Sequence, residues 1–146
     1  MELLHGPLLN QKRLEEALNP KYKFVKRLLS FLRPTNGQFA NIKKTRGSTK
    51  YTKAALELIK VLLNSAEGTR FLAENLLLPQ ISEGLAQLDK SFHVASLDVL
   101  FSPERIRDTL IGDYFVILGA LGKSDDGMRC VLRPQISNCN PLIIFL

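Results

Sequence analysis

The sequence predicts an all-α fold, and three observations support that prediction. Apolar residues recur at helical spacing along most of the 146 residues. No stretch shows the alternation of a sheet, since residues 92–100 are apolar but too short and isolated to build one. A similar helix corner occurs at 62–70 and at 121–129, 59 residues apart. Recurring helix–corner–helix units are typical of armadillo and HEAT repeats, so we expect a segment of an α-solenoid.

The first elements expected are two helices and a long loop. Asn10 can cap a short helix, and Asn19-Pro20 supply a cap and a first-turn proline for the next one. That second helix should span 21–33 and end before Pro34, because proline disfavours helical geometry in the residue that precedes it. Its apolar stripe is Phe24, Val25, Leu28, Leu29, Phe31 and Leu32. Residues 34–48 should form a loop that carries a basic run.

Four further helices are expected after this loop. One should run from Ser48 or Thr49 to about residue 63, a second through Arg70 to Leu76, and a third over about 79–88. Residues 89–101 should be a loop. Ser102-Pro103-Glu104 combine a hydroxyl cap, a proline at the first helical position and an acid in the first turn. They predict the start of a long helix that reaches about residue 121.

The two similar corners share key residues at equivalent positions. Each has a serine that can cap the next helix, an acid that favours a helix N-terminus, and a glycine that permits a tight corner. The offset exceeds one armadillo or HEAT repeat and would correspond to a three-helix unit. The alternative is that two unrelated corners converged on the same residues.

Composition and charge bound the class of protein. The length suits one domain or a piece of a larger one. The formal net charge is +6, with residues 1–60 contributing +9 and residues 61–146 contributing −3. Cys130 and Cys139 fit neither a disulfide framework nor a zinc pattern, which favours two reduced thiols in an intracellular protein. The N-terminus lacks the features of a signal peptide, and the longest charge-free runs are too short to span a bilayer.

No residue pattern predicts catalysis. The two histidines, His5 and His93, are far apart and lie in no recognisable motif. Asp125 and Asp126 stand where a helix should begin, so their expected role is to complement the helix dipole. The sequence has no Gly-rich phosphate loop and no cluster of metal ligands. We therefore expect no enzyme activity, no catalytic, cofactor-binding or metal-binding residues, no cofactor and no small-molecule substrate.

The basic half is the strongest candidate for a binding surface. Its cations, which could form one positive patch, are Lys21, Lys23, Lys26, Lys43, Lys44, Arg46, Lys50 and Lys53. Such a patch could bind nucleic acid, anionic lipid or an acidic protein surface. Nucleic acid is not favoured, because no recognised binding motif is present and Phe39 and Tyr51 are too few for a stacking platform. The alternative is a solvated positive face without a ligand.

Two other features of the basic half, a group of hydroxyl side chains and an amphipathic helix, can each be interpreted as functional or as purely structural. Thr45, Ser48 and Thr49 stand beside basic residues and could be phosphorylated, although such patterns are common. The helix at 21–33 has the amphipathic pattern of membrane-surface or calmodulin-target helices. Its wide apolar stripe and its helical neighbours favour core packing instead.

Several segments together resemble the Rictor family, the pianissimo-type subunits of TOR complex 2, most of all its fungal members. The segments are LLNQKRLEEA (8–17), FVKRLLSFLRP (24–34), FANIKKT (39–45), Lys50-Tyr51, GTRFLAEN (68–75), QISEGLAQLD (80–89), LFSPER (100–105) and DYF (113–115). The resemblance covers roughly residues 2–132 in order. Residues 1–47 resemble the end of the Rictor middle domain, and residues 48–133 resemble the helical segment that follows, which has been likened to a RasGEF N-terminal region. Residues 134–146 look like an atypical tail.

The resemblance implies a non-catalytic role. Rictor proteins are large helical-repeat scaffolds that hold the TOR kinase with a Sin1-type partner and support signalling to AGC kinases, and so act on growth and actin organisation. The resemblance therefore implies TOR kinase and other TOR complex 2 subunits as partners. It also implies a cytoplasmic location, with association at the plasma membrane as part of the complex. Because Rictor subunits are several times longer, we expect this chain to be a fragment or a truncated copy, with marginal stability or self-association in isolation.

The alternative hypothesis does not depend on the resemblance to the Rictor family. A stand-alone basic protein would bind an anionic polymer or a membrane surface through its N-terminal half. Salt-sensitive binding at low ionic strength distinguishes this hypothesis from the scaffold.

Overall fold

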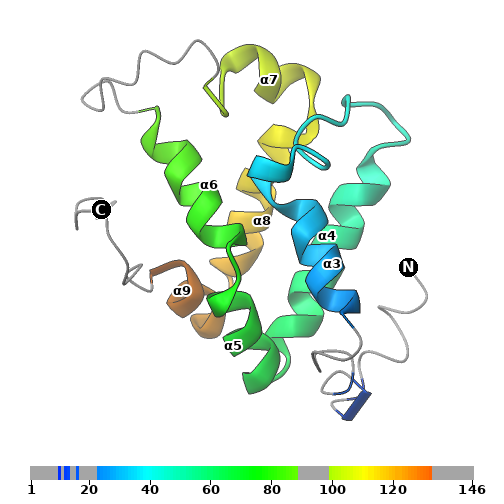
Figure 1. Ribbon diagram of the computed structural model, residues 1–146, viewed down its shortest axis with the longest axis vertical. Helices are drawn as coiled ribbons and strands as arrows, with labels where there is room; N and C mark the ends of the chain where they lie inside the picture. The colour runs from blue at the N-terminus through cyan, green and yellow to red at the C-terminus, as the bar shows by residue number, and fades with distance from the viewer. Residues whose placement is uncertain (1–9, 11, 14–15, 17–22, 89–98, 133–146) are drawn as a thin grey trace.

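The computed structural model describes residues 10, 12–13, 16, 23–88 and 99–132, and every element in this part of the chain is helical (Figure 1). This confirms the all-α prediction. The elements are α3 (Phe24–Leu32), η2 (Pro34–Asn36), α4 (Thr49–Leu63), α5 (Ala66–Glu74), α6 (Leu77–Ala86), α7 (Pro103–Asp108), η4 (Leu110–Gly112), α8 (Asp113–Leu121) and α9 (Asp125–Leu132). The expectations for His5, Asn19-Pro20, His93, Cys139 and the tail at 134–146 lie outside the described residues.

The repeated corner is built the same way in both places. Ser65 Oγ accepts a hydrogen bond from the Gly68 backbone N–H at 2.9 Å, and Ser124 Oγ accepts one from Gly127 at 3.1 Å. A Cβ atom on Gly68 would lie 2.3 Å from the carbonyl oxygen of the leucine six residues earlier, and one on Gly127 would lie 2.2 Å from its counterpart. The glycines are therefore required by the close approach of two backbones. The corners join α4 to α5 and α8 to α9.

These two helical hairpins pack against each other. α4 contacts α8 and α5 contacts α9, while α3 and α6 pack together beside them (Figure 1). Helical hairpins stacked in this way are consistent with a helical-repeat segment. The two hairpins begin their corners 59 residues apart in the sequence, and α6 and α7 lie between them along the chain.

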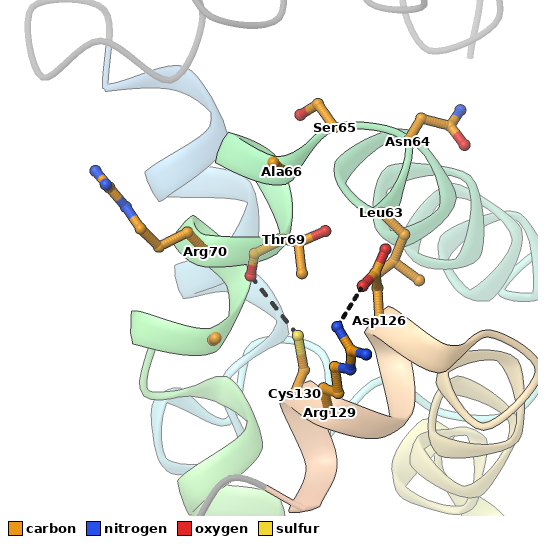
Figure 2. A pocket seen from close by; sticks show the side chains of 10 residues that line it. Leu63, Asn64, Ser65, Ala66, Thr69, Arg70, Asp126, Arg129 and Cys130 are labelled. Carbon is orange, nitrogen blue, oxygen red and sulfur yellow. Dashed lines mark hydrogen bonds and ion pairs between the residues drawn. The ribbon is translucent and has the colours of Figure 1, made fainter.

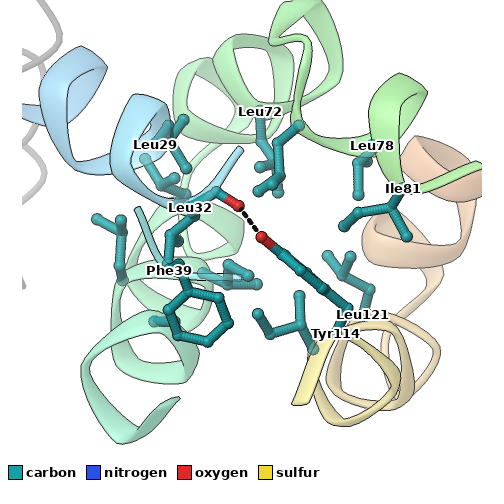
Figure 3. Close-up of a cluster of buried hydrophobic side chains, with 14 of the residues drawn as sticks. Leu29, Leu32, Phe39, Leu72, Leu78, Ile81, Tyr114 and Leu121 are labelled. Atoms are coloured by element: carbon teal, nitrogen blue, oxygen red, sulfur yellow. Dashed lines mark hydrogen bonds between the residues drawn. The ribbon is translucent and has the colours of Figure 1, made fainter. Parts of the chain in front are cut away.

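Tyr114 lies at the centre of the core (Figure 3). Its side chain is fully buried, and its hydroxyl donates a 2.6 Å hydrogen bond to the carbonyl oxygen of Leu32 at the end of α3. The ring packs edge-on against Phe39 at 5.3 Å and Phe101 at 6.2 Å between centroids. Burial raises the pKa of the Tyr114 hydroxyl above its usual value. The residue thus ties α8 to α3 and to the loop that follows α3.

The predicted long helix from residue 103 to about 121 is wrong. The chain leaves helical geometry at Thr109, whose backbone is extended, and a short turn at η4 separates α7 from α8. The backbone groups at this break pair with the loop after η2: Lys44 N–H donates to the Asp108 carbonyl and Leu110 N–H donates to the Ile42 carbonyl, both at 2.9 Å. Hydrogen bonds to a distant segment therefore replace those that would have continued the helix.

Two other predicted boundaries shift by a few residues. α5 ends at Glu74 and α6 begins at Leu77, earlier than the predicted start at Pro79. The reason is Asn75, which has an extended backbone and whose side-chain oxygen accepts a hydrogen bond from the Leu77 N–H at 3.0 Å. Pro79 is accommodated because it lies in the first turn of α6, where its missing N–H has no helical partner to lose. None of the described helices is both long and apolar enough to cross a bilayer.

Candidate interaction surfaces

Five cations form the surface that the sequence singled out, and we call it the basic patch. Its members are Lys43, Lys44, Arg46, Lys50 and Lys53. All five are exposed, on the loop before α4 and on the first turns of α4. Lys23 and Lys26 are exposed at the other end of the basic region, where α3 begins, and Lys21 lies outside the described residues. The five members after η2 are thus exposed on one stretch of the chain, and a single patch that also includes the three cations before α3 and at its start stays a prediction.

Hydrogen bonds hold the backbone of the basic patch in one conformation. Thr45 and Ser48 close a turn: the Thr45 N–H donates to Ser48 Oγ at 2.8 Å, and Ser48 Oγ donates to the Thr45 carbonyl at 2.9 Å. On the other side of the patch, the Arg105 guanidinium donates to Asn41 Oδ1 at 2.9 Å. Together with the pairing of the loop to the break between α7 and α8, these bonds attach the patch to the body of the fold.

The structure also places the three hydroxyls that could be phosphorylated. Ser48 is buried in its turn, whereas Thr45 and Thr49 are exposed. Thr49 Oγ1 donates to the Arg46 carbonyl at 2.8 Å at the start of α4. Ser48 is thus an internal structural hydroxyl, and phosphorylation of Thr45 or Thr49 stays a prediction.

The stretch of chain that carries the basic patch contains no acidic residue. Residues 17–56 include ten Lys and Arg and no Asp or Glu. Within the described residues, the ion pair recorded for the patch joins Lys44 Nζ to Asp113 Oδ1 at 3.9 Å. The carboxylate of Asp113 also accepts a short hydrogen bond from the Thr52 hydroxyl on α4. Most of the positive charge of the patch therefore faces solvent.

One aromatic ring lies inside the basic patch. Tyr51 is 38% exposed, and Lys50 Nζ lies 5.2 Å from the centre of its ring, which is cation–π geometry. The ring of Phe31 on α3 is 6.1 Å from that of Tyr51. Arg27 is one helical turn before Phe31 on the same face of α3, so α3 adds an exposed cation at the edge of the patch. Phe39, the other aromatic considered from the sequence, is fully buried in the core.

A cavity of about 390 Å³ lies at the seam between α5 and α9 (Figure 2). Its lining includes Arg70 and Arg129, which occupy equivalent positions in the two repeated corners. Arg129 lies 3.9 Å from the Asp126 carboxylate and Arg70 lies 3.6 Å from Glu74, while Figure 2 shows Arg70 projecting away from the other labelled side chains. The two arginines therefore do not converge on one point of the cavity.

The same cavity contains the buried Cys130. Its thiol donates a long, 3.7 Å hydrogen bond to the Thr69 carbonyl and so links α9 to α5. Asp125 and Asp126 lie in the first turn of α9, in the position expected for complementing the helix dipole. Across the described ranges, no group of three or more His, Cys, Asp or Glu is arranged to hold a metal ion. The side chains at this seam thus join two helices.

A second cavity, of about 320 Å³, lies between α6 and the segment after α3. Thr35 donates a 2.8 Å hydrogen bond to Gln80 across it, and Gln87 accepts one from the Leu100 N–H at 3.4 Å. Neither cavity could be predicted from the sequence, because each is formed by segments distant in sequence. Neither cavity is lined by a member of the basic patch.

Comparison with known proteins identifies long relatives of this chain. The target of rapamycin complex 2 subunit ste20 of Schizosaccharomyces pombe is 34% identical over 136 residues, which are 93% of this chain and 10% of that protein. The target of rapamycin complex 2 subunit TSC11 of Saccharomyces cerevisiae is 32% identical over 134 residues, 90% of this chain and 9% of that protein. Protein pianissimo A of Dictyostelium discoideum is 33% identical over 147 aligned residues, 92% of this chain and 13% of that protein.

These matches span nearly the whole chain and only a small part of each relative. No family model and no solved structure matches the chain. The chain spans about a tenth of the length of the curated relatives that it matches. The similarity nevertheless covers 90–93% of this chain in relatives from three organisms. The chain therefore belongs to the Rictor family of TOR complex 2 subunits, and it corresponds to a limited segment of those much longer proteins.

Proposed function

We propose that this chain is a non-catalytic helical scaffold segment of a TOR complex 2 subunit. The observation that carries the proposal is that three relatives are 32–34% identical to this chain over at least nine-tenths of its length. Two of these relatives are named as subunits of target of rapamycin complex 2. An all-helical body built from stacked hairpins suits a scaffold, because such bodies present extended surfaces to partners. Side chains at the two cavities make hydrogen bonds that link segments of the scaffold.

The proposal includes partners and a place of action. We infer that the segment helps to assemble the TOR kinase and a Sin1-type subunit into one complex, and through it supports signalling to AGC kinases and the control of growth and actin. The complex would act in the cytoplasm and associate with the plasma membrane as an assembly. Membership of the complex is supported by the names of two relatives, and the individual partners and the place of action are what the resemblance to the Rictor family implies.

A segment exchange tests the proposal. In fission yeast, the matched segment of ste20 is replaced with residues 2–132 of this chain, and the TOR kinase and the Sin1-type subunit are measured after affinity purification of the chimera. We expect both to co-purify at levels close to those of unmodified ste20.

The control chimera carries Tyr114→Asp, which puts a charge at the centre of the core and should lose both partners. A chimera without the substitution that accumulates to the normal level but brings down neither partner would refute the proposal. Equal recovery with the Tyr114→Asp chimera would show that the folded segment is not needed for assembly.

A further inference from the structure

We propose that the basic patch is a docking surface for a membrane rich in anionic phospholipid headgroups. The first argument is charge. Lys43, Arg46, Lys50 and Lys53 are exposed, and no acidic residue occurs between positions 17 and 56. Clustered Lys and Arg near an anionic leaflet each add attraction that decays within a Debye length. A surface with this density of cations therefore gains most from a ligand that presents many negative charges at once.

The second argument is that the patch is preorganised. The turn closed by Thr45 and Ser48, and the pairing of Lys44 with the Asp108 carbonyl, fix the backbone that carries the cations. The remaining members follow on α4, where Lys50 and Lys53 are three residues apart and share a face. Binding therefore costs little conformational entropy in the backbone.

The third argument distinguishes a membrane from other anionic partners. Single-stranded nucleic acid is usually bound in a basic groove, and neither cavity described above is lined by a member of the patch. Protein–protein interfaces are depleted in lysine, whereas four of the five patch cations are lysines. The exposed ring of Tyr51 beside Lys50 matches the pairing of aromatic and basic side chains at the headgroup level of membranes.

Vesicle co-sedimentation with the full chain tests the proposal. Phosphatidylcholine vesicles with and without phosphatidylserine are compared over a series of salt concentrations. We expect binding only to the anionic vesicles, and binding that weakens steeply as salt rises. The triple variant Lys43→Glu, Lys50→Glu and Lys53→Glu should bind on the order of 100-fold more weakly. Lys44 is left intact because it pairs with Asp113.

A matched control separates position from net charge. The triple variant Arg70→Glu, Lys123→Glu and Arg129→Glu changes the net charge by the same amount on the other half of the molecule, at three exposed positions. It should retain vesicle binding within a few-fold. Circular dichroism melting of both variants checks that each is folded, and Tyr51→Ala, which leaves the charges in place, should weaken binding by a few-fold.

Several outcomes would overturn the proposal: no binding to anionic vesicles at low salt, equal loss in the two triple variants, or binding to RNA or to an acidic polypeptide without binding to vesicles. Competition by inorganic phosphate alone at millimolar concentration would likewise assign the patch to soluble phosphate. The experiment contains no TOR complex 2 subunit, so its failure would leave the scaffold role untouched. Failure of the segment exchange would in turn leave vesicle binding unaffected.

Discussion

The corner between α4 and α5 and the corner between α8 and α9 are made from the same residue types in different surroundings. Leu62 and Leu121 are both fully buried where the corners begin. The first corner leads into α5, whose Leu72 is fully buried, whereas the second leads into α9, whose Leu132 is 68% exposed. One local motif thus leads into a well-covered helix, α5, and into a more exposed one, α9. Identical substitutions in the two corners can therefore separate local chemistry from packing.

The largest effect is expected from truncating the buried leucines of the corners. Leu62→Ala and Leu121→Ala should each lower the free energy of unfolding by about 2–5 kcal/mol, the range for Leu→Ala in a packed core. Leu62→Ala should cost more, because α4 is held between α5 and α8, while α9 has an exposed side and can shift to fill part of a cavity. Urea denaturation of the two variants measures this difference. A larger loss at Leu121 would show that the second hairpin is the more rigid one.

The glycines that follow provide the second matched pair. Gly68→Ala and Gly127→Ala would each place a methyl group within 2.3 Å of a backbone oxygen, and the chain must move to relieve the overlap. We expect a loss of about 1–3 kcal/mol at Gly68. At Gly127 the strain should instead detach α9 locally, with faster amide hydrogen exchange in α9 and a smaller change in the global transition. Uniform exchange throughout the Gly127→Ala variant would contradict this expectation.

The hydrogen bond from Tyr114 of α8 to the end of α3 predicts that the stability of the fold depends on pH in the alkaline range. Burial raises the pKa of Tyr114 in the folded chain, so its hydroxyl stays protonated there while the unfolded chain ionises near its ordinary value of 10.0. The contribution of Tyr114 to stability is therefore complete below pH 10 and is lost above it, at about 1.4 kcal/mol per pH unit. Denaturation midpoints at pH 9 to 11 measure this slope. Tyr114→Phe should remove it, and an unchanged slope in that variant would assign the effect to other groups.

The smallest effect is expected from the capping serines. Ser65→Ala and Ser124→Ala each remove one hydrogen bond to a first-turn N–H and should cost about 1 kcal/mol. Because this contribution is local, the two losses should be nearly equal even though the leucine and glycine pairs differ. Thermal melts of the two variants would test the equality. A clear difference would show that even the caps respond to the packing around them.

The position of the basic patch illustrates how far sequence reasoning reached. Its members are close together in the chain and next to a helix start, so a positive surface could be predicted from spacing and charge alone. Its attachment to the body of the fold could not, because the partners are the backbone at Asp108 and the side chain of Arg105, more than sixty residues away. The two cavities were missed for the same reason, since the first is lined by two stretches of the chain and the second by three, all distant in sequence.

The sequence alone determined the helices, their caps at Ser65 and Ser102, and the repeated corner, because periodicity, capping and close backbone approach are local properties. The family could also be recognised from the order of its motifs. Only the tertiary structure decided that the segment from residue 103 to 121 breaks at Thr109 and that Tyr114 becomes the centre of the core. Both features depend on hydrogen bonds to backbone groups that are distant in sequence. The free energy of these hydrogen bonds depends on tertiary packing, so no local sequence pattern could predict them.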